Sequence, residues 1–381
     1  MVDFETIVVG GGAMGSAAAW QLARRGVEVV LLERFGPGHR NGASHGASRN
    51  FNVAYAEADY LGLLDRALPL WRELEAEART ELLQQVGIVN HGRTHAHDAV
   101  HAALVAAGIP SAFVPLAEAA ERWPGIRADG RVLWTPTAGR LHADRAVAAL
   151  QRAAADSGAQ VRHNTRVISI EPHDDHVLVE VMDGDSGAVR RLRSRTAVVT
   201  VGAWTQKLLD GRIALPRLVV TQEQPAHFAL RDGSFVWPGF NHTPAPGEVD
   251  TAWWPSPIYG MQTPGEGIKA GWHGVGPVTD PDERSFRSEP TQLAQLRRYV
   301  AEWLPGADPD AVTEISCTYT TTPDSDFVLD RVGQLIVGAG FSGHGFKFTP
   351  AVGEVLADLA TAAPTAVPER FRLGPRAAPR R

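Results

Sequence analysis

Residues 2–33 read VDFETIVVGGGAMGSAAAWQLARRGVEVVLLE, and this segment holds the clearest structural signal in the chain. The apolar run over 5–9 is typical of a buried strand, and the Ala-rich segment 16–26 is typical of a helix. The apolar segment 27–33 then predicts a second strand. Together they predict a βαβ unit with a glycine-rich turn between its first strand and its helix.

The glycines of this turn have the spacing G-x-G-x-x-G, formed by Gly10, Gly12 and Gly15. Such glycines allow a tight turn, a close approach of the backbone to a pyrophosphate and close packing of the helix, whose N-terminus favours the anion. Glu33 ends the second strand, where it would accept hydrogen bonds from ribose hydroxyls. The segment therefore predicts a dinucleotide site. An acidic residue at this place disfavours NADP but does not separate NAD from FAD.

Length and composition limit the remaining possibilities. A chain of 381 residues exceeds what one hydrophobic core usually fills, so two domains or one interrupted domain are expected. The net charge of −6, without a long Lys/Arg-rich run, argues against a nucleic-acid partner. The N-terminus lacks the basic start of a secretory signal, and no stretch has the roughly eighteen apolar residues of a membrane helix. A cytoplasmic protein without a membrane partner is expected.

Cysteine and lysine are both scarce. The single cysteine, Cys317, excludes an internal disulfide and a cysteine-based metal site. No H-x-x-x-H motif or acidic cluster lies near His273, so no metal is expected. Of the 37 basic residues only Lys207, Lys269 and Lys347 are lysines. Because this chain uses Arg for ordinary positive charge, its lysines are enriched for positions where a compact ammonium is needed, although chance retention is the alternative.

The pattern along the chain predicts one domain interrupted by another. Helices are expected over 59–79, 100–107 and 143–157, and strands over 160–164, 167–172, 177–182 and 196–204. Residues 215–320 are rich in Pro, Trp and Gly and predict an antiparallel substrate domain, after which 334–362 again reads strand, glycine loop and helix. The predicted nucleotide-binding domain comprises 1–82, 143–213 and 325–381, and the substrate domain comprises 83–142 and 214–324.

Several motifs have two interpretations when taken alone. GAGFSGHGFKF (338–348), with Lys347, fits either a ligand contact or a tight turn with a solvated lysine. NGASHGASR (41–49) fits either a loop around a flat ligand or a plain surface loop. Cys317 is either a buried small side chain or a reactive thiolate. In GIKAGWH, Lys269 and His273 share a strand face, and His273 alone would more often be structural. No G-x-S-x-G elbow is present, which excludes an α/β-hydrolase.

Taken together, these motifs resemble the monomeric sarcosine oxidase and N-methyltryptophan oxidase family of the glycine oxidase and D-amino acid oxidase superfamily. The resemblance runs nearly end to end through VVGGGAMGSAAAWQLARRG, NGASHGASR, ERWPGI, VGAWTQKLL, GIKAGWH, SCTYTTTPDSDFVLD and GFSGHGFKF. It implies a Rossmann-like α/β domain that binds FAD, interrupted by an α+β substrate domain with a largely antiparallel sheet. It also implies a monomer that oxidises the C–N bond of a secondary amine or amino acid to an imine, with O2 reduced to H2O2.

The resemblance implies roles for individual residues. Cys317 resembles the thiol that joins the flavin 8α-methyl carbon, and Lys269 the lysine that promotes reaction with O2. His273, Tyr259 and Tyr319 resemble substrate-pocket residues, and Lys347 the partner of a substrate carboxylate. The implied cofactor contacts are Gly10, Gly12, Ala13, Met14, Gly15, Glu33, Arg34, Ser44, His45, Ser48, Arg49, Val167, Gly202, Trp204, Cys317, Gly343, His344, Gly345, Phe346 and Lys347.

The sequence departs from the family at Asn52, within SRNFN, where the family has a second Arg that binds the substrate carboxylate. Loss of a bidentate guanidinium weakens carboxylate recognition. Sarcosine itself is therefore not the expected substrate, and a bulkier or differently charged amine in a biosynthetic pathway is. The alternatives are a flavin dehydrogenase that passes electrons to a carrier protein, an NAD-dependent dehydrogenase, and a nucleotide-binding paralogue without catalysis.

Overall fold

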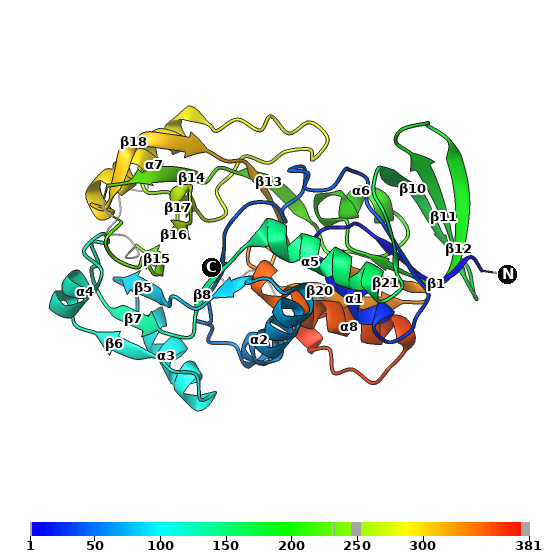
Figure 1. Cartoon of the computed structure of the whole chain (residues 1–381), viewed down its shortest axis with the longest axis horizontal. Helices are drawn as coiled ribbons and strands as arrows, with labels where there is room; N and C mark the ends of the chain where they lie inside the picture. The colour runs from blue at the N-terminus through cyan, green and yellow to red at the C-terminus, as the bar shows by residue number, and fades with distance from the viewer. Residues whose placement is uncertain (1, 232, 245–252, 375–381) are drawn as a thin grey trace.

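The structure is a computed structural model that describes residues 2–231, 233–244 and 253–374. Two large sheets lie at opposite ends of an elongated molecule (Figure 1). The N-terminal strand lies at one end with helices packed on its sheet, and the second sheet lies at the other end. This arrangement confirms the predicted α/β class with a Rossmann-like part. The predicted domain boundaries stay a proposal.

The first sheet contains eight strands among the described residues, and its centre is parallel. Its strands are β1 (Phe4–Val9), β2 (Val29–Leu32), β9 (Gln160–Arg162), β10 (Thr165–Pro172), β11 (Val177–Asp183), β12 (Val189–Val199), β20 (Val328–Val332) and β21 (Leu335–Ala339). β1 pairs in parallel with β2 and β12, while β10, β11 and the first half of β12 form an antiparallel meander. β21 pairs in parallel with the end of β12, which brings the C-terminal glycine loop beside the N-terminal one.

Three helices pack against this sheet and against each other. They are α1 (Ala13–Ala23), α5 (Ala143–Asp156) and α8 (Thr349–Thr361). α1 is buried along its whole length, which its small alanine side chains permit. A Cβ on Gly353 would lie 2.5 Å from the Cβ of Ala17, so the glycine allows α8 to approach α1 closely. The long helix α2 (Ala58–Ala78) buries Trp71 and Leu74 in the same core.

The second large sheet is mainly antiparallel, as predicted. Its strands are β5 (Ile88–Gly92), β6 (Ala112–Val114), β7 (Val132–Thr135), β14 (Ala226–Leu230), β15 (Gly239–Thr243), β16 (Ile258–Thr263), β17 (Gly267–Trp272) and β18 (Ala307–Glu314). One pair, β15 with β5, is parallel. Around it lie α3 (Ala96–Ala106), α4 (Leu116–Arg122) and α7 (Pro290–Trp303).

Two details of the sequence-based prediction were wrong. No helix was placed within residues 215–320, yet they include α7, which begins at Pro290 after an N-cap Glu289 that accepts hydrogen bonds from two backbone N–H groups. The strand expected over 196–204 ends at Val199, and Gly202–Trp204 form a 3₁₀ turn that leads into α6 (Thr205–Leu209). A glycine with φ of +54° begins this turn, a conformation that glycine adopts without strain.

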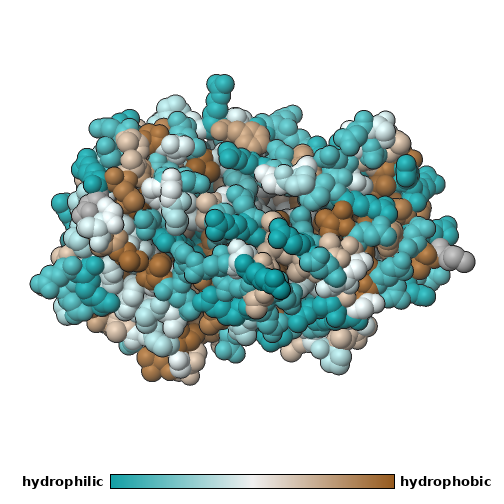
Figure 2. Space-filling view, viewed as in Figure 1, coloured by the Kyte–Doolittle hydropathy of each residue, from teal (hydrophilic) through white to brown (hydrophobic). Residues whose placement is uncertain are grey.

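Two small sheets connect the large ones. One contains β3 (Arg49–Phe51), β8 (Gly139–Leu141) and β4 (Leu83–Gln84), and the other contains β13 (Val219–Glu223) and β19 (Cys317–Thr321). The face in Figure 2 is mostly hydrophilic with scattered apolar patches. Among the described residues, no helix combines the length and apolar character needed to cross a membrane.

Candidate active site

The first glycine loop has the geometry that its spacing predicts. Gly10 has φ of +99°, and a Cβ on Gly15 would lie 1.9 Å from the Gly10 carbonyl oxygen, so side chains at these positions would block the turn. α1 begins at Ala13, directly after Gly12, and therefore directs its free backbone N–H groups at the loop. This cradle of backbone fits a pyrophosphate, as required for a dinucleotide.

The side chain of Glu33 is buried beside this loop. Its carboxylate accepts hydrogen bonds from the backbone N–H of Gly11 at 2.7 Å and of Phe35 at 2.9 Å, and His39 Nε2 lies 3.4 Å away. Burial alone would raise the pKa of Glu33, but His39 and these backbone donors together hold that pKa below its ordinary value. The carboxylate is thus ionised and keeps accepting positions for a ribose.

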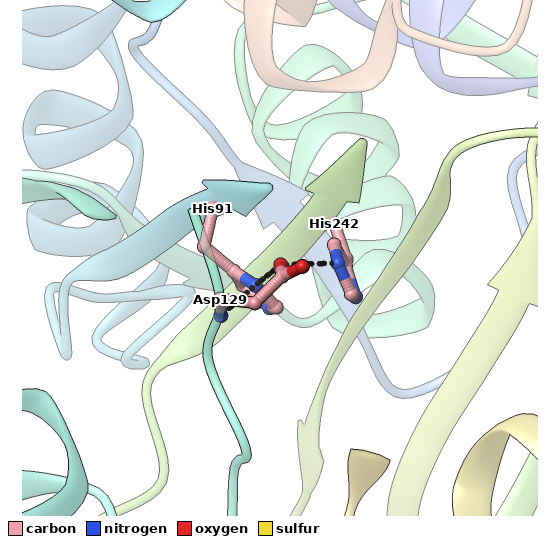
Figure 3. A group of neighbouring side chains, drawn as sticks. All are labelled: His91, Asp129 and His242. Atoms are coloured by element: carbon pink, nitrogen blue, oxygen red, sulfur yellow. Dashed lines mark hydrogen bonds and ion pairs between the residues drawn. The ribbon is translucent and has the colours of Figure 1, made fainter. Parts of the chain in front are cut away.

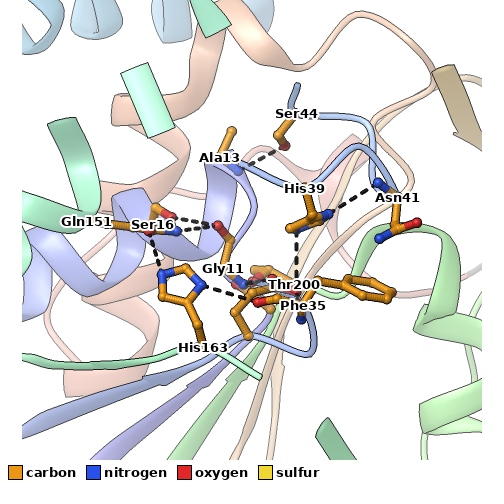
Figure 4. A network of polar contacts seen from close by, with 12 residues as sticks. Gly11, Ala13, Ser16, Phe35, His39, Asn41, Ser44, Gln151, His163 and Thr200 are labelled. Carbon is orange, nitrogen blue, oxygen red and sulfur yellow. Dashed lines mark hydrogen bonds and ion pairs between the residues drawn. The ribbon is translucent and has the colours of Figure 1, made fainter. Parts of the chain in front are cut away.

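A polar network holds the loop in place (Figure 4). Gln151 donates from Nε2 to the Gly11 carbonyl oxygen at 2.8 Å, and Ser16 donates to the same oxygen at 2.9 Å. His163 contacts Gln151 at 3.1 Å, and Ser44 accepts from the Ala13 backbone N–H at 3.0 Å. These bonds join α1 and α5 to the loop, so the phosphate cradle is preformed.

One cavity of about 410 Å³ extends from this loop to Cys317. Most of the predicted cofactor residues line it: Gly10, Gly12, Ala13, Met14, Glu33, Arg34, Ser44, His45, Arg49, Val167, Gly202, Trp204, Cys317, Gly343, Gly345 and Phe346. Tyr319 lines it as well. The other predicted site residues do not line it: Gly15, Ser48, Asn52, Tyr259, Lys269, His273, His344 and Lys347. Ser48, Tyr259, Lys269 and His273 lie near its Cys317 end through their contacts with one another and with Arg49, Cys317 and Tyr319. His344 and Lys347 are chain neighbours of the lining residues Gly343, Gly345 and Phe346, and Gly15 packs beneath the glycine turn.

Cys317 begins β19 and pairs with Glu223 of β13. Its thiol lies 3.8 Å from a guanidinium nitrogen of Arg49 and about 4.0 Å from the Ala43 carbonyl oxygen. The side chain is only 9% exposed, yet it borders the cavity. The guanidinium therefore lies within contact distance of the sulfur.

Lys269 lies on β17 and is 5% exposed. Its Nζ donates to the Ser48 carbonyl oxygen at 3.3 Å, which places the ammonium next to the loop that carries Arg49. Burial, and secondarily the charge of Arg49, lowers the pKa of Lys269 to about 7. Burial of the His45 ring, and secondarily the charge of Arg49, lowers the pKa of His45 to about 3. His45 is therefore neutral.

Two tyrosines and a histidine form a group beside Cys317. Tyr319 contacts His273 Nδ1 through its hydroxyl at 3.3 Å. Tyr259 lies on β16 opposite Gly271, where a Cβ would lie 2.9 Å from the tyrosine hydroxyl oxygen. A Cβ on Gly343 would lie 2.2 Å from the ring of Tyr319, so only glycine lets the second glycine loop cover this ring.

Lys347 is 5% exposed and belongs to a closed hydrogen-bond network. His344 Nε2 faces the Ser325 carbonyl oxygen at 3.1 Å and must donate to it, so Nδ1 is an acceptor. Tyr55 therefore donates its hydroxyl to that Nδ1 at 3.1 Å and accepts from Lys347 Nζ at 2.9 Å. Lys347 also donates to the His344 carbonyl oxygen at 2.6 Å, which leaves one of its three N–H bonds for a ligand.

The charge states follow from burial. The pKa of Lys347 is lowered to about 7, and that of His344 to about 3 by burial and by the nearby ammonium. Among the described residues, no carboxylate forms an ion pair with Lys347. Asn52 does not reach this network through its side-chain oxygen, which accepts from the Ala54 backbone N–H at 3.1 Å.

Three residues of this region were not predicted from the sequence. Tyr55 orients Lys347, as described above. Glu223 is 1% exposed, accepts from Thr221 Oγ1 at 2.6 Å and contacts the Gly276 backbone N–H at 3.3 Å; burial raises its pKa. Asp282 accepts from both Arg34 and Trp204 at the dinucleotide end of the cavity. None belongs to a short motif, so only their placement in space identifies them.

The glycine cradle and the elongated cavity define a dinucleotide-dependent enzyme, and comparison with known proteins identifies the class. Residues 5–359 match the family described as FAD dependent oxidoreductase, and the chain belongs to that family. The sequence is 34% identical over 378 residues to monomeric sarcosine oxidase of Bacillus sp. (strain NS-129), covering 95% of this chain and 94% of the relative. It is 29% identical over 378 residues to N-methyl-L-tryptophan oxidase of Yersinia pestis (strain Pestoides F), covering 96% and 97%.

A solved structure agrees with this assignment. NikD, an unusual amino acid oxidase essential for nikkomycin biosynthesis, superposes with a TM-score of 0.83 at 26% identity, covering 97% of this chain and 96% of that chain. The predicted FAD-dependent amine oxidase, with O2 as the acceptor, is thereby confirmed. The alternative of an NAD-dependent dehydrogenase is wrong.

Proposed function

We propose that this enzyme oxidises an amine that carries one anionic group, and that Lys347 binds that group. The observation that carries the proposal is the buried Lys347 ammonium. Among the residues that the structure describes, its hydrogen-bond acceptors are the Tyr55 hydroxyl and the His344 carbonyl oxygen, and both are uncharged. A buried ammonium without a counter-ion is unfavourable, and an anionic substrate group would supply the missing charge. A single lysine is a point charge, which suits contact with one oxygen more than bidentate recognition.

We propose further that Cys317 binds FAD covalently at the flavin end of the cavity. Its S–H bond and one C–H bond of the flavin 8α-methyl group would be replaced by an S–C bond, with O2 as the final acceptor of the two electrons and two protons. The support is the position of this thiol on the cavity wall, next to the guanidinium of Arg49. FAD bound there would supply the redox chemistry: a hydride leaves the carbon next to the amine nitrogen and a proton leaves the nitrogen, O2 is the final electron acceptor, and an imine and H2O2 result. The glycine loop and Glu33 would hold its pyrophosphate and ribose.

Other side chains are assigned by their places around this end of the cavity. Lys269 would stabilise the negative charge that develops when O2 is reduced. Tyr259, Tyr319 and His273 would line the substrate pocket, because they cluster between Cys317 and Lys347. Since the amine must be neutral to be oxidised, a pocket formed by aromatic rings favours the form without charge on nitrogen. The monomeric state and the cytoplasmic location stay predictions from the sequence.

Matched substrate pairs test the role of Lys347. Peroxide release is measured for N-methyl amino acids and for their neutral amides, with the unmutated enzyme and with Lys347→Met. We expect the acids to be oxidised with the lower KM by the unmutated enzyme, and the variant to lose most of this difference. An unmutated enzyme that prefers the amides would refute the proposed anion site.

The covalent bond is tested separately. Unmutated protein denatured in acid should keep its yellow colour in the pellet, whereas denatured Cys317→Ser should release FAD into the supernatant. Before denaturation, Cys317→Ser should have the native fold. Arg49→Lys is a matched variant that keeps the thiol and a positive charge. Colour that leaves the denatured unmutated protein would contradict the covalent bond without affecting the anion site.

A further inference from the structure

A second cluster of titratable side chains lies in the other large sheet (Figure 3). His91 lies on β5 and His242 on β15, and these two residues are paired in the parallel register of the strands. Both rings therefore lie on one face of the sheet, with their centroids 3.9 Å apart. Asp129, from the loop before β7, directs its carboxylate at both rings. None of these residues lines the cofactor cavity.

Two members of the cluster have good hydrogen bonds. His242 Nε2 lies 2.9 Å from Asp129 Oδ1, and its Nδ1 lies 2.9 Å from the Tyr299 hydroxyl. Arg93 Nε lies 3.4 Å from the other carboxylate oxygen of Asp129. The remaining carboxylate oxygen, Asp129 Oδ1, therefore faces both imidazole rings.

His91 has no comparable partners, although it is completely buried. Its Nδ1 lies 3.4 Å from the Asp129 backbone nitrogen and 3.6 Å from Asp129 Oδ1, and both distances are longer than an ordinary hydrogen bond. Its Nε2 has no hydrogen-bond partner among the described residues. The Asp129 backbone N–H points at Nδ1, so Nδ1 carries the lone pair and Nε2 carries the proton. Because both contacts of Nδ1 are long, its lone pair is available to a metal ion beside Asp129.

We propose that His91, Asp129 and His242 bind one Zn²⁺ ion. Two imidazoles and one carboxylate are a donor set that Zn²⁺ prefers. Zinc–nitrogen and zinc–oxygen bonds of roughly 2.0–2.1 Å in a tetrahedron place the donor atoms about 3.3 Å apart. Asp129 Oδ1 lies 2.9 Å from His242 Nε2 and 3.6 Å from His91 Nδ1, distances on either side of this separation.

The surroundings fit such an ion. With His242 Nε2 bound to zinc, its Nδ1–H would donate to the Tyr299 hydroxyl, which is the orienting contact that zinc-bound histidines usually have. The Asp129 side chain is 24% exposed, which leaves a route for the ion and a place for water as the fourth ligand. The ligands come from three segments far apart in sequence, so the expectation of no metal, which rested on local motifs, had no means of finding them.

The ion would have a structural role. It would join β5, β15 and the loop of Asp129, and β15 is the direct neighbour of β16, the strand that carries Tyr259. Zinc binding should therefore raise the thermal stability of the protein more than it changes turnover.

Metal analysis of the full-length, flavin-containing protein tests this site. The protein is treated with EDTA, dialysed against micromolar free ZnCl2 and analysed by mass spectrometry for zinc per chain. We expect one equivalent for the unmutated protein and at least a tenfold weaker affinity for Asp129→Asn and for His91→Gln. His176→Gln is the matched control, because His173 and His176 form a stacked pair elsewhere that could also bind zinc. This control should keep both the zinc and the zinc-dependent rise in Tm.

Two results would overturn the site: absence of bound zinc from the unmutated protein, or loss of zinc from the His176→Gln control with retention in Asp129→Asn. The first would mean that an ordered water satisfies His91. If the cluster variants do not fold, X-ray absorption of the unmutated zinc-loaded protein decides, since a first shell with two imidazoles supports the site and a shell without imidazole refutes it.

Discussion

Replacement of Tyr55 by Phe tests the network around Lys347 most directly. The variant keeps the aromatic ring, which packs near Tyr60, His344 and Phe348, and removes only the hydroxyl. That hydroxyl accepts from Lys347 Nζ at 2.9 Å and donates to His344 Nδ1 at 3.1 Å. Without it the ammonium keeps a single acceptor, the His344 carbonyl oxygen, and is free to change direction.

The size of the effect follows from the lost contact. A hydrogen bond to a charged group contributes about 1.5–3 kcal/mol, and each 1.4 kcal/mol or so corresponds to a tenfold change in affinity. We therefore expect KM for an anionic amine to rise by about tenfold to a hundredfold, with a smaller change in kcat. Burial already lowers the pKa of Lys347 to about 7, and loss of an acceptor lowers that pKa further. A lysine is charged only below its pKa, so kcat/KM for the anionic amine should fall as the pH rises through that pKa. In the variant this fall should begin at a lower pH than in the unmutated enzyme.

The assay is initial-rate peroxide release from pH 6 to pH 9, for an anionic amine and for its neutral amide. Tyr60→Phe is the matched control, because the Tyr60 hydroxyl donates to Asp326 at 2.8 Å and the ring packs near the same Phe348. We expect the control to lose stability but to keep the pH profile of the unmutated enzyme. Equal pH profiles for the two variants, or an equal rise in KM for acid and amide, would refute the orienting role of Tyr55.

Four further predictions concern other parts of the site. Lys269→Met should slow reaction of the reduced enzyme with O2 by up to about a thousandfold, because unit charges roughly 4 Å apart at an effective dielectric near 20 interact by about 4 kcal/mol. Stopped-flow absorbance should show a much smaller effect on reduction of the enzyme by the amine. In the unmutated enzyme the same O2 reaction should weaken as pH rises through the Lys269 pKa of about 7. Asn52→Arg should improve kcat/KM for small N-methyl amino acids. If sarcosine were already the best substrate of the unmutated enzyme, this prediction would be contradicted. Glu223→Gln should cost about 1–3 kcal/mol in urea unfolding, because an amide replaces a carboxylate that accepts from Thr221 Oγ1 and contacts the Gly276 backbone N–H.

Local sequence patterns predicted the nucleotide-binding part of the fold well because its elements are set by nearby residues. The apolar run before Gly10 and the alanines of α1 leave little choice of structure, and the turn needs glycine for steric reasons. α7 was missed although Leu296, Tyr299 and Val300 have helical spacing and are buried. The surrounding Pro, Trp and Gly residues favoured an interpretation as strands, so composition outweighed periodicity where periodicity was correct.

The candidate site was predictable only where its residues lie within motifs. Cys317, Lys269 and Lys347 belong to distinctive segments, whereas Tyr55 is one tyrosine in an ordinary loop before a helix. Its importance comes from His344 and Lys347, nearly 300 residues later, which reach it because β21 returns to the first sheet beside β12. Contacts made by such a return of the chain depend on tertiary packing and leave no periodic trace in the sequence.

The three lysines show how a compositional argument acquires a physical basis in the structure. Lys207 is exposed and forms ion pairs with Asp280 and Asp282, a role that an arginine could also fill. Lys347 differs, because its ammonium directs two N–H bonds at Tyr55 and at the His344 carbonyl and keeps a third for a ligand. A planar guanidinium has five N–H donors in a rigid fork and would leave several of them buried without acceptors. The scarcity of lysine therefore has meaning only at the buried positions, where the shape of the cation, and not its charge alone, decides which residue fits.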